Sequence, residues 1–222
     1  MNPRHRLWAL AVATALVLAG QVRIFLHASP AQPNEIVSLP IRLAASEGLT
    51  PFSKKALTTE AAAIWRQSGI DLHWLTSEAA DPSLRVLVTP HAVAAHGDRK
   101  QWTLGELLRF DNNKAALAVV SIAGAQRIVS ENQRLRFVDH GEEHDYRLGL
   151  VLGRAVAHEI GHYLLRTNTH AVSGLMRATI DAREFAAINS RPFGLDAAAQ
   201  AHLAQLAAAP LSQAPFFSYT SR

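Results

Sequence analysis

Apolar and polar residues follow two periodicities along the chain, one typical of strands and one of helices. Alternation with a period of two, or a short apolar run, predicts strands over residues 36–44, 70–75, 84–89 and 115–123. Pro40 suggests that the first of these is an edge strand or is irregular, because proline cannot donate a ladder hydrogen bond. Residues 91–114 are polar, and their pattern assigns them to no element.

Apolar residues spaced three and four apart predict the helices. One covers residues 50–69 and ends at Gly69, and another follows the strand at 115–123 and reaches about Glu131. A long helix is expected from about Tyr146, with Asp145 as its N-cap. A last helix is expected over residues 194–209, with Asp196 near its start.

Glycines at two turns of the long helix, Gly149 and Gly153, are expected to let it approach the sheet closely. The order of elements is strand, helix, two or more strands, long helix, turn and final helix. This order predicts an α+β fold in which a mixed sheet packs on helices. The 222 residues suffice for one such domain. We expect it to span residues 32–210, after an N-terminal segment at 1–31 and before a loose tail at 211–222.

The first residues have the pattern of an export signal. Arg4 and Arg6 precede a mostly apolar, uncharged stretch at residues 7–20, which is short for a bilayer crossing. If the apolar residues after Arg23 are included, residues 7–26 could serve as an uncleaved membrane anchor. The main domain is therefore expected outside the cytoplasm, secreted or periplasmic, or tethered to the membrane.

The charge and the composition exclude several classes of function. The net charge is +4, but residues 1–28 hold Arg4, Arg6 and Arg23 and no acid, which leaves 19 basic against 18 acidic residues. No basic run marks a phosphate-binding face, so nucleic acid is not expected as a partner. The chain has no cysteine. Disulfides, thiolate metal ligands and cysteine nucleophiles are thereby excluded, and so is a thiol-based propeptide latch.

A metal-binding pattern, His-Glu-x-x-His, lies on the long helix. His158 and His162 are four residues apart and therefore project from one helix face. Two imidazoles at this spacing can hold one Zn²⁺ at about 2.0–2.1 Å each. Glu159 is rotated away from the ligand direction, where it can act as a base on water. The apolar or small residues around the motif favour a dry site.

Together with this motif, the later His170 and the segment "SGLM" at residues 173–176 resemble the metzincin-type zinc peptidases of the zincin group. The resemblance implies a zincin-like α+β fold, with a twisted mixed sheet packed on a long metal-binding helix and a C-terminal helix. It also implies a third histidine ligand and a methionine, here Met176, beneath the metal. A peptide or protein substrate would lie along an edge strand, for which residues 115–121 are the candidate.

The spacing after His162 departs from that family, which would have glycine at 165 and histidine at 168. The residues here are Leu165 and Asn168, and His170 comes two positions later. Asn168 tolerates the left-handed conformation that ends a helix, so it could replace glycine as the turning residue. His170 is the expected third ligand, and Glu184 and Asn168 are the alternatives.

The expected function is an exported zinc-dependent endopeptidase in which Glu159 takes a proton from the attacking water and returns it to the leaving amine. The alternative is a catalytically inactive zincin-fold module that binds metal or has a structural role at the cell envelope. A second pair, His140 and His144, lies in a charged stretch that is expected to be a solvated loop. His91 and His96 receive no role.

Overall fold

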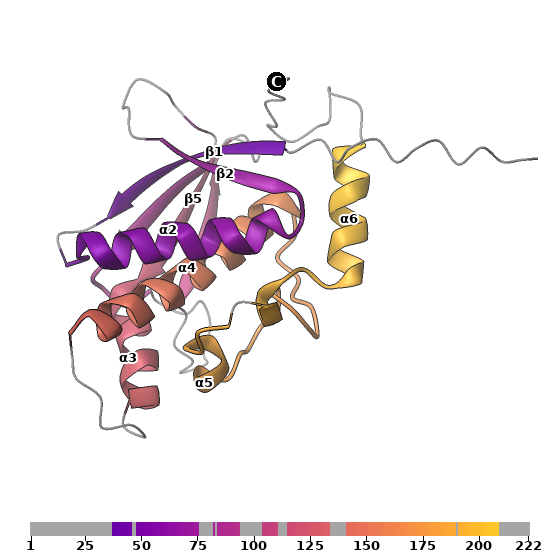
Figure 1. Cartoon of the computed structure of the whole chain (residues 1–222). Helices are drawn as coiled ribbons and strands as arrows, with labels where there is room; N and C mark the ends of the chain where they lie inside the picture. Colours follow the sequence, from indigo (N-terminus) through magenta and orange to yellow (C-terminus); the bar gives the residue numbers. More distant parts are fainter. Residues whose placement is uncertain are drawn as a thin grey trace, which may run out of the picture. The chain divides into compact units, whose positions relative to one another are not determined.

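A mixed sheet covered on one face by helices is the centre of the fold (Figure 1). The chain divides into Met1–Glu35 and Ile36–Arg222, and all residues described below belong to the second unit. The computed structural model describes residues 37–45, 48–75, 82, 84–93, 104–110, 115–133, 141–189 and 191–208. Its strands are β1 (Val37–Ala45), β2 (Ile70–Leu75), β3 (Leu84–Thr89), β4 (Gly105–Phe110) and β5 (Ala115–Ser121). Its helices are α2 (Pro51–Arg66), α3 (Ile122–Gln133), α4 (Glu142–Leu164), α5 (Ala182–Phe185), η3 (Arg191–Phe193) and α6 (Ala197–Ala207).

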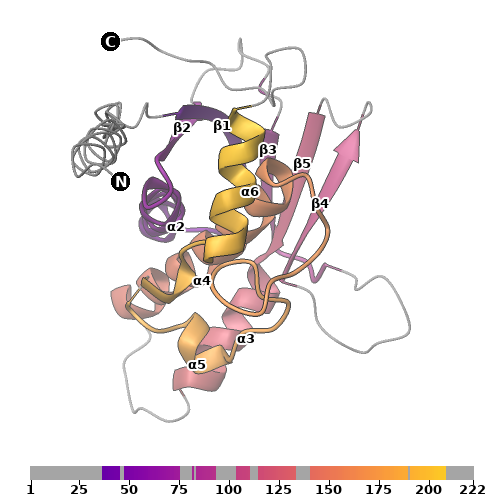
Figure 2. The ribbon, with the colours of Figure 1, turned by 90° about the vertical axis from the view of Figure 1, so that its right-hand side faces the viewer.

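The strands lie in the order β2-β1-β3-β5-β4, which can be followed across the sheet in Figure 2. The β1–β2, β1–β3 and β3–β5 pairs are parallel, and β4 runs antiparallel to β5. The fold is therefore α+β with a mostly parallel sheet, as the sequence predicts. Two edge predictions are wrong. Pro40 lies in the internal strand β1, but pairing with β3 begins only at Ile41, so proline is tolerated there. Residues 115–121 form β5, which is internal because β4 covers its outer side.

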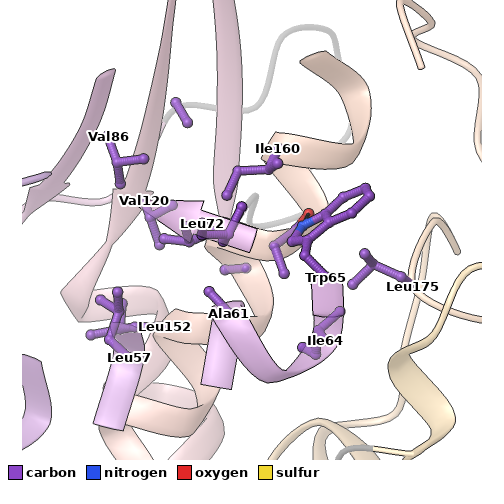
Figure 3. Close-up of a cluster of buried hydrophobic side chains, with 14 of the residues drawn as sticks. Leu57, Ala61, Ile64, Trp65, Leu72, Val86, Val120, Leu152, Ile160 and Leu175 are labelled. Atoms are coloured by element: carbon purple, nitrogen blue, oxygen red, sulfur yellow. Dashed lines mark hydrogen bonds between the residues drawn. The ribbon is translucent and has the colours of Figure 1, made fainter. Parts of the chain in front are cut away.

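The hydrophobic core lies between the sheet and the α2–α4 pair, where Figure 3 shows side chains from all three meeting. On β3, Leu84, Val86 and Val88 are fully buried, whereas Arg85 between them is exposed. This alternation is the expected pattern for a strand with one face on the core. From α2, the fully buried Trp65 donates from its indole Nε1 to the carbonyl of Ala157 at 3.1 Å. The indole thereby ties α2 to the helix that carries the histidine motif.

The helix boundaries agree with the predicted ones except at the start of α4. Gly69 has a φ of 74° just after α2, and the Asp196 side chain caps α6 by accepting from Ala199 N at 2.8 Å. Helix α4, however, begins at Glu142 after Gly141, so Asp145 is not its N-cap. Acidic residues in the first turn, Glu142 and Glu143 among them, interact favourably with the positive end of the helix dipole. This interaction explains why a helix begins within so polar a stretch.

Asp145 instead joins the starts of two helices. Its carboxylate accepts a hydrogen bond from Thr50 Oγ1 at 2.9 Å, and its carbonyl accepts one from Ser53 Oγ at 2.9 Å. Thr50 is also the N-cap of α2, accepting from Ser53 N at 3.1 Å. These bonds fix the register of α2 against α4 at their N-terminal ends.

Two glycines of α4 lie against α2 rather than against the sheet as expected. A Cβ at Gly149 would lie 2.4 Å from Ala56 Cβ and 2.6 Å from Ser53 O. A Cβ at Gly153 would lie 2.7 Å from Leu57 O. Backbone atoms cannot move aside without shifting the helix, so the close α2–α4 packing requires glycine at both positions.

We therefore expect Gly149→Ala to destabilise the protein by about 1–3 kcal/mol, the usual cost of overpacking. A loss of stability would be evidence for the close packing, because alanine is the better helix former by about 1 kcal/mol and would stabilise an exposed helix. Chemical denaturation of both proteins measures the difference. A variant as stable as the wild type would show that α2 and α4 do not approach this closely.

A buried ion pair links three segments of the core. Arg154 of α4 is completely buried, and its Nε donates to Glu60 Oε1 of α2 at 2.7 Å. Its Nη1 donates to the carbonyl of Phe185 at 2.7 Å, at the end of α5. Its guanidinium lies 4.4 Å from the ring centroid of Phe193 in η3. One arginine therefore connects α2, α4 and the segments after the histidine motif.

The predicted N-terminal segment (1–31), its anchor candidate (7–26) and the tail (211–222) lie outside the described residues. Among the helices of the described ranges, none has both the length and the apolar character needed to span a membrane.

Candidate metal centre

The two histidines of the His-Glu-x-x-His motif project from one face of α4 near its C-terminal end. His158 is half-buried and His162 is buried. Their Nε2 atoms lie 3.1 Å apart. Two nitrogens bound at about 2.0–2.1 Å to one tetrahedral ion lie about 3.3 Å apart, so the observed separation fits a shared metal.

Backbone carbonyls hold the other ring nitrogen of each histidine. His158 Nδ1 lies 2.8 Å from the carbonyl oxygen of Leu175, and His162 Nδ1 lies 2.8 Å from that of Thr167. A carbonyl can only accept, so each Nδ1 carries the proton and donates it. Each Nε2 is then left with its lone pair, which is the tautomer that a metal ligand needs.

His170 completes the group from the loop after α4. One nitrogen from each of His158, His162 and His170 lies within 4.8 Å of the others. The ring of His170 has its centroid 5.3 Å from that of His158 and 4.9 Å from that of His162. It is the exposed member of the three. The structure thus brings together the three histidines that the sequence singles out.

The residue that turns the chain toward His170 is not the expected one. Helix α4 ends at Leu164, and the left-handed conformation falls on Arg166, with a φ of 51°, rather than on Asn168. A non-glycine residue in this region costs about 1–2 kcal/mol. The chain thus turns at Arg166, two residues earlier than expected, and the connection after α4 brings His170 back to His158 and His162.

The two other candidate ligands are engaged elsewhere. The carboxylate of Glu184 forms a two-point ion pair with Arg177, with Nη1 donating at 3.1 Å and Nη2 to the second oxygen. Asn168 Oδ1 accepts a hydrogen bond from Arg109 Nη1. The group of potential metal-binding side chains around His158 contains His170 and not Glu184.

Glu159 is buried beside the edge strand β4. A Cβ at Gly105, the first residue of β4, would lie 2.8 Å from Glu159 Oε1. Glycine at this position therefore makes room for the carboxyl group. The pKa of Glu159 is raised to about 8, chiefly by burial and also by the charge of Glu106, with Arg109 acting in the opposite direction. The carboxyl is thus poised to exchange a proton near neutral pH.

The "SGLM" segment forms a turn under the motif. Met176 is buried, and a Cβ at Gly161 would lie 2.2 Å from its sulfur, so Met176 packs directly on α4. Gly174 has a φ of 71°, and Ala171 N donates to Met176 O at 2.7 Å, which closes the turn. The hydrogen bond between this turn and the motif involves the residue before Met176, since the carbonyl of Leu175 accepts from His158 Nδ1.

Sequence reasoning missed the contribution of β4. Gly105 and Arg109 both face the motif from this strand, which lies within the polar stretch that the pattern left unassigned. Of the second histidine pair, only His144 lies within the described residues. His144 lies in the first turn of α4, which corrects the expectation of a loop there, and His91 is exposed. His140 and His96 lie outside the described residues.

The chain resembles a solved structure in its fold but matches no family model and no curated protein. The crystal structure of archaemetzincin from Methanopyrus kandleri is similar, with a TM-score of 0.47 and 14% sequence identity. The match covers 76% of this chain and 94% of that one.

Proposed function

We propose that the protein is a zinc-dependent endopeptidase whose zinc is held by His158, His162 and His170. The carrying observation is the convergence of three histidine nitrogens within 4.8 Å, beside a buried glutamate. Three protein ligands with one open position are the usual set for catalytic zinc, whereas structural zinc is closed by four. An all-imidazole set also suits Zn²⁺ better than Mg²⁺ or Ca²⁺, which prefer oxygen.

The protonation states support metal binding. The pKa of His158 is lowered to about 4, chiefly by burial; the hydrogen bond to Leu175 O raises it, and the charges of His162 and His170 lower it. Burial also lowers the pKa of His162. Both imidazoles are therefore neutral at pH 7, and no proton has to leave before an ion binds.

In this proposal Glu159 performs the proton transfers. A zinc ion held by the three histidines would supply Lewis acidity to a bound water and to the scissile carbonyl. Glu159 accepts the proton of the attacking water and delivers it to the leaving amine. Burial raises the pKa of Glu159 in the metal-free site. The positive charge of a bound Zn²⁺ would lower it again, which favours the carboxylate that accepts the water proton.

The edge strand β4 is the proposed binding place of the peptide. Within the described sheet β4 is outermost, and its Gly105 lies against Glu159. An extended peptide can add to such an edge through main-chain hydrogen bonds, which would carry its carbonyl past the base. Export of the domain, expected from residues 7–26, remains part of the proposal.

Zinc content and chelation test the proposal. The purified full chain is expected to bind one Zn²⁺ and to cleave an unstructured protein, and both properties should be lost with a chelator and restored by Zn²⁺. A protein that binds no zinc would refute the proposal.

The third ligand is tested by three alanine variants. His170→Ala should weaken zinc binding by more than the about 10–100-fold that loss of a group bonded to a ligand costs. Glu184→Ala and Asn168→Ala should retain more affinity than His170→Ala, and competition with a chromogenic chelator measures all three. If Glu184→Ala released zinc and His170→Ala kept it, the assignment of His170 would be wrong.

A further inference from the structure

Arg109 of β4 contacts the connection between His162 and His170 from a different part of the chain. Its Nη2 donates to the carbonyl of His162 at 2.7 Å and to that of Thr167 at 3.3 Å. Its Nη1 donates to Asn168 Oδ1. A single guanidinium thereby holds three acceptors on both sides of the turn.

The first acceptor is a carbonyl that the end of α4 leaves open. In a continuing helix the carbonyl of His162 would accept from Arg166 N. Arg166, with its φ of 51°, donates instead to Tyr163 O at 3.3 Å. Arg109 replaces the missing donor, and its positive charge lies at the negative end of the helix dipole.

The second acceptor is shared with a ligand. Thr167 O accepts from both His162 Nδ1 at 2.8 Å and Arg109 Nη2 at 3.3 Å. Holding this carbonyl fixes the direction in which His162 points. The third acceptor, the side chain of Asn168, lies two residues before His170 and so restrains the part of the loop that carries the exposed histidine.

We propose that Arg109 is a positioning residue that presents His162 and His170 to the metal by clamping the loop between them to strand β4. The strand is itself anchored, since Arg109 pairs with Ala116 of β5. The inference rests on the proposed function, because it presumes that the three histidines bind zinc. Loops of this length otherwise sample many conformations, and a planar fork of donors restricts them at three points.

The test is the zinc dissociation constant of the full chain, measured by competition with a chelator. Arg109→Ala is expected to bind Zn²⁺ about 10–100-fold more weakly. Asn168→Ala should lose about 10-fold, and the double variant should be no weaker than Arg109→Ala, because both changes remove the same contact. Arg109→Lys should stay weak, since an ammonium keeps the charge but cannot reach all three acceptors.

The matched control is Arg66→Ala. Arg66 forms an exposed ion pair at 3.6 Å with Asp71 of β2, on the opposite edge of the sheet, and its loss should leave zinc affinity unchanged. Urea denaturation of the metal-free proteins gives a second readout: Arg109→Ala should lose some stability with its three hydrogen bonds but still unfold cooperatively, so that the weaker zinc binding is measured on a folded protein.

The outcomes separate the two proposals. If the wild type binds no zinc, the proposed function fails and this inference with it. If the wild type binds zinc and Arg109→Ala binds it equally tightly, only the clamp is overturned. Full affinity in Arg109→Lys, or strictly additive losses in the double variant, would also overturn it. If Arg109→Ala fails to fold, Asn168→Ala decides: unchanged affinity refutes the clamp.

Discussion

Replacing Glu159 by glutamine is expected to slow peptide hydrolysis by about 10²–10⁴-fold, the usual contribution of a general acid–base group. Glutamine has nearly the same shape, so it should fit the space beside Gly105 that a larger change would disturb. It cannot take up a proton from water at neutral pH. The histidines are untouched, so the bound zinc should stay at one ion per chain. Hydrolysis of an unstructured protein and metal analysis of the same samples measure both quantities.

Glu143→Gln is the matched control for this result. Glu143 lies on the same helix, in its first turn, where it pairs with Arg147 at 2.6 Å. Sixteen residues of helix separate it from Glu159, a rise of about 24 Å. Its replacement should leave hydrolysis unchanged. Equal activity in Glu159→Gln and the wild type would show that another group is the base. Zinc binding by a wild type that cleaves no protein would favour the alternative of an inactive metal-binding module.

Replacing Arg154 by alanine is expected to lower the free energy of unfolding by about 3–5 kcal/mol. The side chain is fully buried, and Glu60, its partner at 2.7 Å, is 7% exposed. Removing the guanidinium leaves a buried carboxylate without its counter-charge. The carbonyl of Phe185 loses its donor, and the ring of Phe193 loses its cation. Urea denaturation with the linear extrapolation gives the difference.

Two further variants test why Arg154→Ala loses stability. Arg66→Ala breaks an ion pair whose side chains are 67% and 50% exposed, so it should cost at most about 1 kcal/mol. The double replacement Glu60→Leu and Arg154→Met removes both charges from the core, and most of the lost stability should return. A loss below about 1 kcal/mol in Arg154→Ala would mean that water reaches this pair. A double variant as unstable as the single one would point to lost packing as the cause.

The sequence predicts those parts of the fold whose residues repeat a pattern locally. Strands β1, β2, β3 and β5 and helices α2, α3 and α6 coincide with the predicted segments, because each buries one face and alternates accordingly. His158, Glu159 and His162 are found together for the same reason, since a spacing of four on a helix defines their geometry.

The remaining parts depend on contacts between distant segments. Strand β4 carries Glu106 and Arg109 and is half-exposed, so its composition hides it among polar residues. Its place at the edge, and with it the internal place of β5, follows only from pairing. The turn at Arg166 is accompanied by hydrogen bonds that Arg109 donates from strand β4 to the carbonyl of His162 and its neighbours. Nothing in the local sequence pattern specifies these long-range contacts or the approach of His170.

The oxygens that orient the first two histidines belong to the main chain, at Leu175 and Thr167. Every amino acid offers such an oxygen, so orienting the two histidines requires a backbone path rather than a particular side chain at Thr167 or Leu175. Position 175 still needs an apolar side chain for another reason, because Leu175 is buried in the hydrophobic core. A centre built in this way leaves a faint signature in sequence, and its relatives are better sought by the geometry of three histidine nitrogens and their backbone acceptors than by residue identity.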